Sequence, residues 1–226
     1  MNIRPEVLPF IYASLAAGFF VFLLLLACRL RRRIAAWTGT VIAIILCGYM
    51  VYFFRDPDRT PPSDPHAVLA GADGVVMHVT DLFEPDVLAT NAVRISIYLS
   101  LFDVHVNRAP ISGMASFLAY VPGKHYLTIR EKSSELNQHN KILIEGNGTR
   151  CLIHQIVGPV CRRVVYWPDH DKPTPLKAGD RIGMMKFGSR LDMIFPKHDI
   201  EVLVAKGDRV SAGETVIARL KRETLP

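Results

Sequence analysis

The segment best suited to chemistry lies near the C-terminal end, at residues 181–196, and contains the pair Gly188-Ser189. A serine hydroxyl becomes an effective nucleophile when a neighbouring base takes its proton. Glycine permits backbone angles and close approaches that other residues resist. A Gly-Ser pair between two apolar segments is, however, also common in tight turns. The pair by itself therefore indicates a turn as readily as a site.

Other kinds of site chemistry find little support in the sequence. It contains no glycine-rich phosphate loop and no paired-cysteine metal pattern. Cys28 and Cys47 fall inside apolar runs, while Cys151 and Cys161 fit either buried thiols or a disulfide. The net charge of +6 indicates an acidic partner, but charge alone does not distinguish nucleic acid from anionic lipid or a small anion.

The surroundings of Ser189 resemble a known processing site. Residues 187–190, Phe-Gly-Ser-Arg, are followed by Leu-Asp-Met-Ile-Phe-Pro, which is similar to the self-cleavage site of the short, bacterial and archaeal phosphatidylserine decarboxylases. Further motifs occur in that family's order at residues 52–57, 71–74, 97–108 and 120–124. Because these motifs are specific in combination, the chain is identified as a member of this pyruvoyl-dependent family.

The resemblance implies that the chain cuts itself between Gly188 and Ser189. The Ser189 hydroxyl is expected to attack the preceding carbonyl, and elimination with loss of ammonia then leaves a pyruvoyl cofactor at residue 189. This ketone forms a Schiff base with phosphatidylserine and accepts the electrons released with carbon dioxide, which yields phosphatidylethanolamine. The family implies no metal, pyridoxal phosphate, nucleotide or nucleic-acid partner, and its large and small chains stay associated.

The matching motifs also offer two candidates for proton transfer, His105 and Asp73. Histidine is the usual proton carrier near neutral pH, and an acidic residue could orient it. In longer relatives a second histidine lies three residues after the position of His105, where this chain has Arg108. A hydrogen-bonded structural histidine and a turn-forming aspartate are the alternative interpretations of His105 and Asp73.

Three basic residues in the motifs, Arg108, Lys124 and Arg190, are candidates for substrate binding. A guanidinium group matches a phosphate or carboxylate with two parallel hydrogen bonds, so these side chains could hold the lipid headgroup. Solvated surface charge is an equally acceptable interpretation of each.

Two apolar runs at residues 7–28 and 34–54 must hold such an enzyme at its substrate. Each is about as long as the roughly 20 residues that a helix needs to cross a bilayer. Residues 1–54 are therefore predicted to form a membrane hairpin, although a cleaved signal or a buried soluble hairpin is an alternative. The arginine-rich turn at residues 29–33 favours the cytoplasm, which would place the body outside. Because the family's lipid substrate is made in the cytoplasmic leaflet, we expect the body on the cytoplasmic side.

The remaining sequence predicts a linker at residues 55–66 and one catalytic domain at residues 67–226. Prolines and charges dominate the linker. The body carries short runs rich in β-branched and aromatic residues, separated by Gly, Pro, Asn and Asp, which is typical of a mainly antiparallel β-fold. Strands are expected at residues 74–79, 93–101, 114–121, 141–145, 151–157, 163–167 and 191–195, and one short helix at residues 129–139.

A weak internal repeat relates residues 176–183 to residues 204–213, each with a Gly-Asp turn before an apolar residue. The second copy is similar to the hairpin of biotinyl and lipoyl domains, which predicts barrel-sandwich features in the β body. A membrane-tethered carrier or adaptor of that kind is the alternative function. It accounts neither for the motif at residues 97–108 nor for Gly188-Ser189, and likeness of fold says little about chemistry. The oligomeric state stays open.

Overall fold

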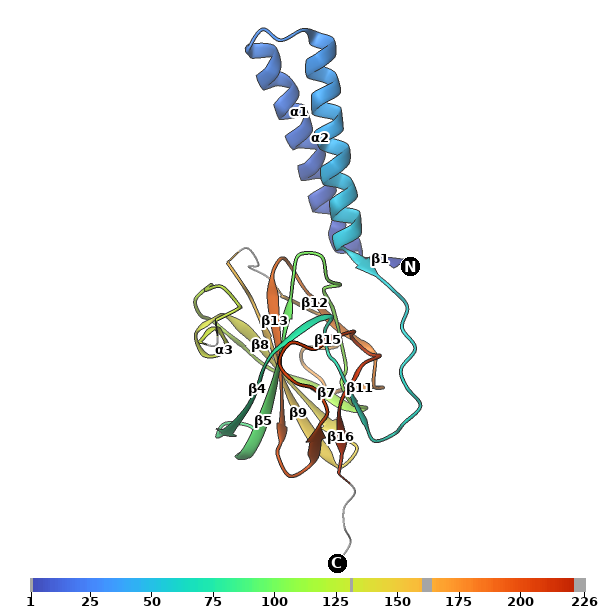
Figure 1. Cartoon of the computed structure of the whole chain (residues 1–226), viewed down its shortest axis with the longest axis vertical. Helices are drawn as coiled ribbons and strands as arrows, with labels where there is room; N and C mark the ends of the chain where they lie inside the picture. The colour runs from blue at the N-terminus through green and yellow to red at the C-terminus, as the bar shows by residue number, and fades with distance from the viewer. Residues whose placement is uncertain (1, 131, 160–163, 222–226) are drawn as a thin grey trace, which may run out of the picture. The chain divides into compact units, whose positions relative to one another are not determined.

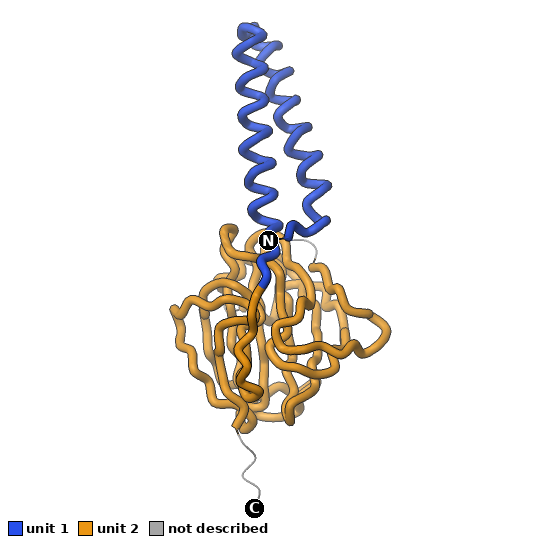
Figure 2. Tube along the Cα trace, turned by 90° about the vertical axis from the view of Figure 1, so that its right-hand side faces the viewer, with its two compact units in different colours: residues 1–58 blue, residues 59–226 orange. Residues whose placement is uncertain are grey.

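The computed structural model describes residues 2–130, 132–159 and 164–221. The chain divides into two compact units, residues 1–58 and residues 59–226 (Figure 2). Each unit is described separately below.

The first unit is a helical hairpin. A short 3-10 turn, η1 (Pro5–Val7), leads into α1 (Leu8–Ala27), and α2 (Arg32–Phe53) returns antiparallel to it. Both helices are long and apolar enough to cross a membrane, so the prediction of two apolar helices is confirmed.

Two glycines bring these helices together. A Cβ added to Gly18 would lie 2.7 Å from the carbonyl oxygen of Gly39, so the two backbones are in contact there. Small residues at such crossings are typical of helix pairs in membranes. Below the helices, β1 (Asn2–Ile3) pairs with β2 (Arg55–Asp56) and closes the unit.

The second unit is a mainly antiparallel β body, as the sequence predicts. Its largest sheet has the strand order β11-β7-β8-β9-β13-β5-β4-β15, and two three-stranded sheets have the orders β10-β12-β6 and β14-β16-β3. The strands are β3 (Ala67–Leu69), β4 (Gly74–Glu84), β5 (Thr90–Leu99), β6 (Val106–Arg108), β7 (Gly113–Val121), β8 (His139–Gly146), β9 (Thr149–Ile156), β10 (Val164–Tyr166), β11 (Thr174–Leu176), β12 (Arg181–Met185), β13 (Ser189–Pro196), β14 (Ile200–Val202), β15 (Arg209–Val210) and β16 (Val216–Leu220).

β13 lies at the centre of this architecture, between β5 and β9 (Figure 1). Side chains alternate across a strand, so Leu191, Met193 and Phe195 point to one face and join the main apolar core. Arg190 and Asp192 therefore point to the opposite face, where they are equally buried. A strand buried on both faces is held strongly in register.

The expected strands are all found, some longer than predicted. Residue 163, the first of the strand expected at 163–167, lies outside the described residues. Cys161, one partner of the possible disulfide, also lies outside them, and Cys151 is a buried free thiol. The prediction of a helix over residues 129–139 is wrong except for a single turn, α3 (Ser133–Leu136). The backbone around it bonds to other elements instead; for example, the nitrogen of Gln138 donates a hydrogen bond of 3.0 Å to the carbonyl oxygen of Lys124.

The internal repeat forms the same turn twice. Asp180 accepts a hydrogen bond of 2.7 Å from the backbone nitrogen of Lys177, and Asp208 accepts one of 2.8 Å from Ala205. In each copy the preceding glycine has a left-handed backbone, with φ of 88° at Gly179 and 102° at residue 207. The Gly-Asp pattern is thus a turn signature.

Candidate functional site

Ser189 begins the central strand β13, opposite Leu99 of β5. The residue is completely buried. Its hydroxyl oxygen has no hydrogen-bond partner among residues 2–130, 132–159 and 164–221. A buried hydroxyl without a partner is costly, so an unbonded one is a feature that requires an explanation.

The backbone just before Ser189 is strained. Phe187 and Gly188 both adopt the left-handed conformation, with φ of 59° and 63°. This conformation is unfavourable for a residue such as phenylalanine, and strain of this kind is concentrated at functional sites. A Cβ on Gly188 would meet nothing within 4 Å, so glycine suits this position because of its backbone angles rather than for lack of space.

His105 lies close to the start of this turn. Its carbonyl oxygen accepts a hydrogen bond of 3.1 Å from Met185, the last residue of β12 before the turn. The ring is fully buried, and its Nδ1 lies 3.0 Å from the carbonyl oxygen of Asp103. Because a carbonyl oxygen only accepts, Nδ1 donates, and in a neutral ring Nε2 is then the nitrogen able to take a proton.

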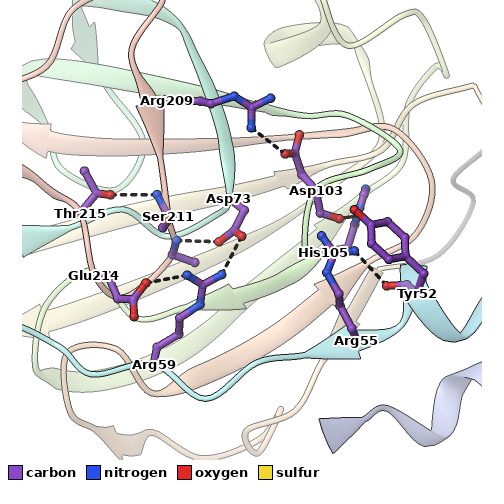
Figure 3. Close-up of polar contacts among 11 residues, drawn as sticks. Tyr52, Arg55, Arg59, Asp73, Asp103, His105, Arg209, Ser211, Glu214 and Thr215 are labelled. Carbon is purple, nitrogen blue, oxygen red and sulfur yellow. Dashed lines mark hydrogen bonds and ion pairs between the residues drawn. The ribbon is translucent and has the colours of Figure 1, made fainter. Parts of the chain in front are cut away.

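Asp103 is itself fixed in place. Its carboxylate accepts hydrogen bonds of 2.8 Å and 2.6 Å from the backbone nitrogen and hydroxyl of Ser100. Figure 3 shows it between His105 and Arg209, whose guanidinium lies 3.3 Å away. The tight turn at residues 100–103 thereby sets the orientation of the histidine ring.

Asp73 occupies a different cluster. Its carboxylate forms an ion pair of 2.8 Å with Arg59 and accepts a hydrogen bond of 2.7 Å from the backbone nitrogen of Ala212 (Figure 3). Arg59 also pairs with Glu214 at 2.5 Å, and this hydrogen bond holds the pKa of Glu214 below its ordinary value. These contacts favour a structural role for Asp73.

Arg108, the last residue of β6, lines a polar cavity of about 430 Å³. Its guanidinium donates a hydrogen bond of 2.8 Å to the carbonyl oxygen of Gly179 and is largely buried. Arg59, Arg181 and Asp180 also line this cavity. Guanidinium groups suit an anionic group such as a phosphate or carboxylate, although the charge of Arg59 is already paired with Asp73 and Glu214.

Arg190 has its side chain in a buried ion pair. Its Nε lies 2.7 Å from Asp192 and its Nη2 donates to the hydroxyl of Ser96 at 2.7 Å. Ser134 of α3 donates to the same carboxylate at 2.6 Å. Burial alone would raise the pKa of Asp192, but Arg190, the two hydroxyl groups and Arg94 together hold that pKa below its usual value.

Lys124 is exposed on the segment that precedes α3. Its ammonium lies 5.4 Å from the centre of the Tyr126 ring, and its backbone nitrogen donates to Leu136 at 2.7 Å. The structure thus leaves Lys124 in a different environment from the two buried arginines.

A chain of buried amides was missed by the sequence analysis. Asn140 donates to Gln155 at 3.2 Å, and Gln155 donates to Asn107 at 2.8 Å. Gln155 of β9 lies opposite Leu191 of β13, and Leu191 lies on the same face of β13 as Ser189. The amide hydrogen bonds therefore connect β6 to the face of the sheet that carries Ser189. The only sequence signal was the position of Asn107, two residues after His105. Within the described residues, no group of His, Cys, Asp and Glu side chains is arranged to hold a metal ion.

Comparisons with known proteins agree with this geometry. The family model described as phosphatidylserine decarboxylase matches residues 46–218. A phosphatidylserine decarboxylase proenzyme of Carboxydothermus hydrogenoformans is 43% identical over 82% of this chain and 85% of its own length. The proenzyme of Gluconacetobacter diazotrophicus is 40% identical over 96% of this chain and 94% of its own. No solved structure matches the chain.

These matches define a class, that of a carboxy-lyase made as a proenzyme. The chain belongs to the phosphatidylserine decarboxylase family.

Proposed function

We propose that this phosphatidylserine decarboxylase cuts its own chain between Gly188 and Ser189, and that Ser189 supplies its pyruvoyl group. The observation that carries the assignment to this serine is its buried, unbonded hydroxyl directly after two left-handed residues. The family supplies the reaction, which is the conversion of phosphatidylserine into phosphatidylethanolamine and carbon dioxide.

The self-cleavage begins as an isomerisation of the chain. The Oγ atom of Ser189 forms a bond to the carbonyl carbon of Gly188 while the bond from that carbon to the Ser189 nitrogen breaks. The hydroxyl proton moves to the nitrogen, so atoms and charge balance without a second reactant. A base must carry the proton, and His105 has the appropriate tautomer beside the turn.

The location of Ser189 fits the group that it would become. A small ketone is no larger than the serine side chain it replaces, and it forfeits no hydrogen bond, because the hydroxyl makes none within the described residues. When formed, this group supplies the electron sink for decarboxylation. The chain's own residues hold it at the start of β13 and shield it from bulk water.

The substrate headgroup has a candidate site in the arginine-lined cavity. Arg108 is the residue of the three predicted binders that lines it, and we assign it to the phosphate or carboxylate of the lipid. Arg190 instead takes a positioning role, since its charge is already paired with Asp192. Lys124 is exposed beside the Tyr126 ring, and we assign it to contact with the headgroups at the membrane surface.

The two apolar helices support a membrane anchor. We assign residues 1–54 to the anchor, residues 55–66 to the linker and the rest to catalysis, with the body on the cytoplasmic side where the substrate is made. The paired Gly-Asp turns support a barrel-sandwich arrangement related to biotinyl and lipoyl domains. A membrane-tethered carrier with that fold is the second candidate, and it requires an uncut chain.

Intact-mass measurement tests this function directly. Purified protein is expected to contain residues 1–188 and residues 189–226, the smaller chain carrying a blocked N-terminus. The chains should elute together in detergent, because β13, β15 and β16 of the smaller chain pair with β5, β4 and β3 of the larger one. They should separate only in denaturant. An active preparation consisting of one uncut chain would exclude the proposal.

Replacing His105 with Ala tests the proton carrier. We expect self-cleavage to slow about 100-fold or more, because general acid–base catalysis contributes roughly that much. The time course of small-chain release measures it. His170, an exposed histidine whose ring contacts Phe117 and Tyr166, is the control, and His170→Ala should cleave at the normal rate. If His105→Ala and His170→Ala release the small chain at equal rates, His105 is a structural residue and not the proton carrier.

A further inference from the structure

Gly158 lies against the bond that the chain is proposed to cut. It follows β9, which pairs with β13, so it runs beside the turn before Ser189. A Cβ added to Gly158 would lie only 2.3 Å from the carbonyl oxygen of Gly188, and 3.4 Å from the methyl group of Thr128. Real Cβ atoms essentially never come closer than 3.0 Å to such a neighbour. Only glycine therefore fits beside this carbonyl without displacing it.

The backbone leading to Gly158 is rigidly held. Asn137 is almost fully buried, and its Nδ2 donates hydrogen bonds of 2.8 Å to the carbonyl oxygens of Val157 and Tyr126. The Val157 nitrogen in turn donates to Gln138 at 3.1 Å. Val157 is thus held at both its nitrogen and its carbonyl oxygen, and residues 157 and 158 form a wall beside Gly188. We expect a clash at Gly158 to be relieved by movement of the strained turn at Gly188 rather than of this wall.

We propose that Gly158 is a positioning residue for self-cleavage, which holds the Gly188 carbonyl where the Ser189 hydroxyl can attack it. This inference rests on the proposed cleavage at Gly188-Ser189. The wall limits where the oxygen of the carbonyl can lie, and the left-handed angles of Phe187 and Gly188 set the direction from which the chain approaches it. Neither feature is part of the proton-transfer machinery.

The expected size of the effect follows from the geometry. Moving the carbonyl oxygen from 2.3 Å to the 3.0 Å minimum requires a shift of roughly 0.7 Å. Attack requires the reacting atoms to lie about 3–3.5 Å apart and aligned, and a misplacement of about 1 Å can cost on the order of 100-fold in rate. Gly158→Ala is therefore expected to form the ester about 100-fold more slowly.

Gly146 provides a matched control. A Cβ there would lie 2.3 Å from the backbone carbonyl oxygen of Ser112, the same distance as at Gly158, and also 2.6 Å from the Cα of Gly113, so the clash at Gly146 is at least as severe. Neither Gly146 nor Gly158 has a left-handed backbone, so Ala adds no backbone strain of its own at either position. The full chain carrying Gly146→Ala should lose at least as much stability as Gly158→Ala yet still cleave at the wild-type rate.

The experiment compares newly synthesised full-length chains in detergent, with and without hydroxylamine, which cleaves esters readily. Because hydroxylamine also cleaves Asn-Gly bonds and the chain contains Asn147-Gly148, the fragments are identified by mass as residues 1–188 and 189–226. Over the time in which the wild-type chain is fully cut, Gly158→Ala should stay almost wholly uncut in both conditions, with an unfolding temperature no lower than that of Gly146→Ala. Release of fragments by hydroxylamine would mean that the acyl shift proceeds normally, and would overturn the proposal. An uncut wild-type chain would instead refute the proposed cleavage at Gly188-Ser189. Failure of the cleavage proposal is therefore distinguishable from failure of the positioning role of Gly158.

A second variant covers the case in which Gly158→Ala does not fold. Asn137→Ser keeps glycine at residue 158 but removes the hydrogen bond that Nδ2 makes to Val157 of the wall, together with the bonds that the Asn137 amide makes to Tyr126. It should slow cleavage measurably without introducing a clash. A folded Asn137→Ser chain that is cut at the wild-type rate would contradict the positioning role.

Discussion

Replacing Ser189 with Ala is expected to leave a single uncut chain without decarboxylase activity. The variant lacks the oxygen that must attack the Gly188 carbonyl, and it cannot yield the ketone on which decarboxylation depends. Stability should not fall, because the Ser189 hydroxyl has no hydrogen-bond partner within the described residues and its removal leaves no group newly unsatisfied. Intact mass, activity and urea unfolding measure the three outcomes.

Ser133 gives a matched control for this substitution. It is also a completely buried serine, but its hydroxyl donates to the carbonyl oxygen of Arg130 at 2.6 Å. Ser133→Ala should lose about 1 kcal/mol of stability and still be cut. A Ser189→Ala chain that decarboxylates phosphatidylserine normally would refute the pyruvoyl assignment.

Removing Asp192 is expected to have the largest effect on stability. Asp192→Ala leaves Arg190 buried and without its carboxylate, and breaking a buried pair in this way typically costs about 3–5 kcal/mol. The folded state lowers the pKa of Asp192 below its usual 3.8, so its contribution is complete above that pH and is lost as the pH falls through the folded pKa. Urea unfolding at pH 7 and near pH 3 should therefore show a large and a smaller difference, respectively.

Two comparisons make this prediction specific. Asp86 is mostly exposed in its pair with Lys141, so Asp86→Ala should cost less than about 1 kcal/mol. The double variant Arg190→Met, Asp192→Leu should recover part of the lost stability, because it removes the buried charge of Arg190 together with that of Asp192, although Arg94 still loses its 3.8 Å ion pair with Asp192. If Arg190→Met instead kept full stability and raised the KM for phosphatidylserine, Arg190 would bind substrate, as the sequence first suggested.

Much of the fold could be predicted because its signals are local. The apolar helices are identified by length and composition, and strands such as β5 and β7 by their β-branched and aromatic residues. The helix expected at residues 129–139 failed for a tertiary reason. Asn137 bonds to Tyr126 and Val157, far along the chain, and these contacts outweigh local helix propensity.

The candidate site was only partly predictable. Motif resemblance identified Gly188 and Ser189, but the strain at Phe187 and the clash beside Gly158 depend on how distant segments meet. Arg190 looked like a substrate ligand because its partner Ser96 lies 94 residues away in sequence. Nothing in the linear pattern distinguishes a buried, paired arginine from an exposed one.

The central place of β13 also has a consequence for the protein's synthesis. A newly made chain begins with a terminus that normally frays in solvent. The proposed cut creates a second N-terminus at Ser189, between β5 and β9 and with no exposed surface. A small chain synthesised separately would have to insert its N-terminal strand between two strands of a sheet that has already folded. If the chain folds first and is cut afterwards, the new N-terminus forms directly in the interior of the sheet.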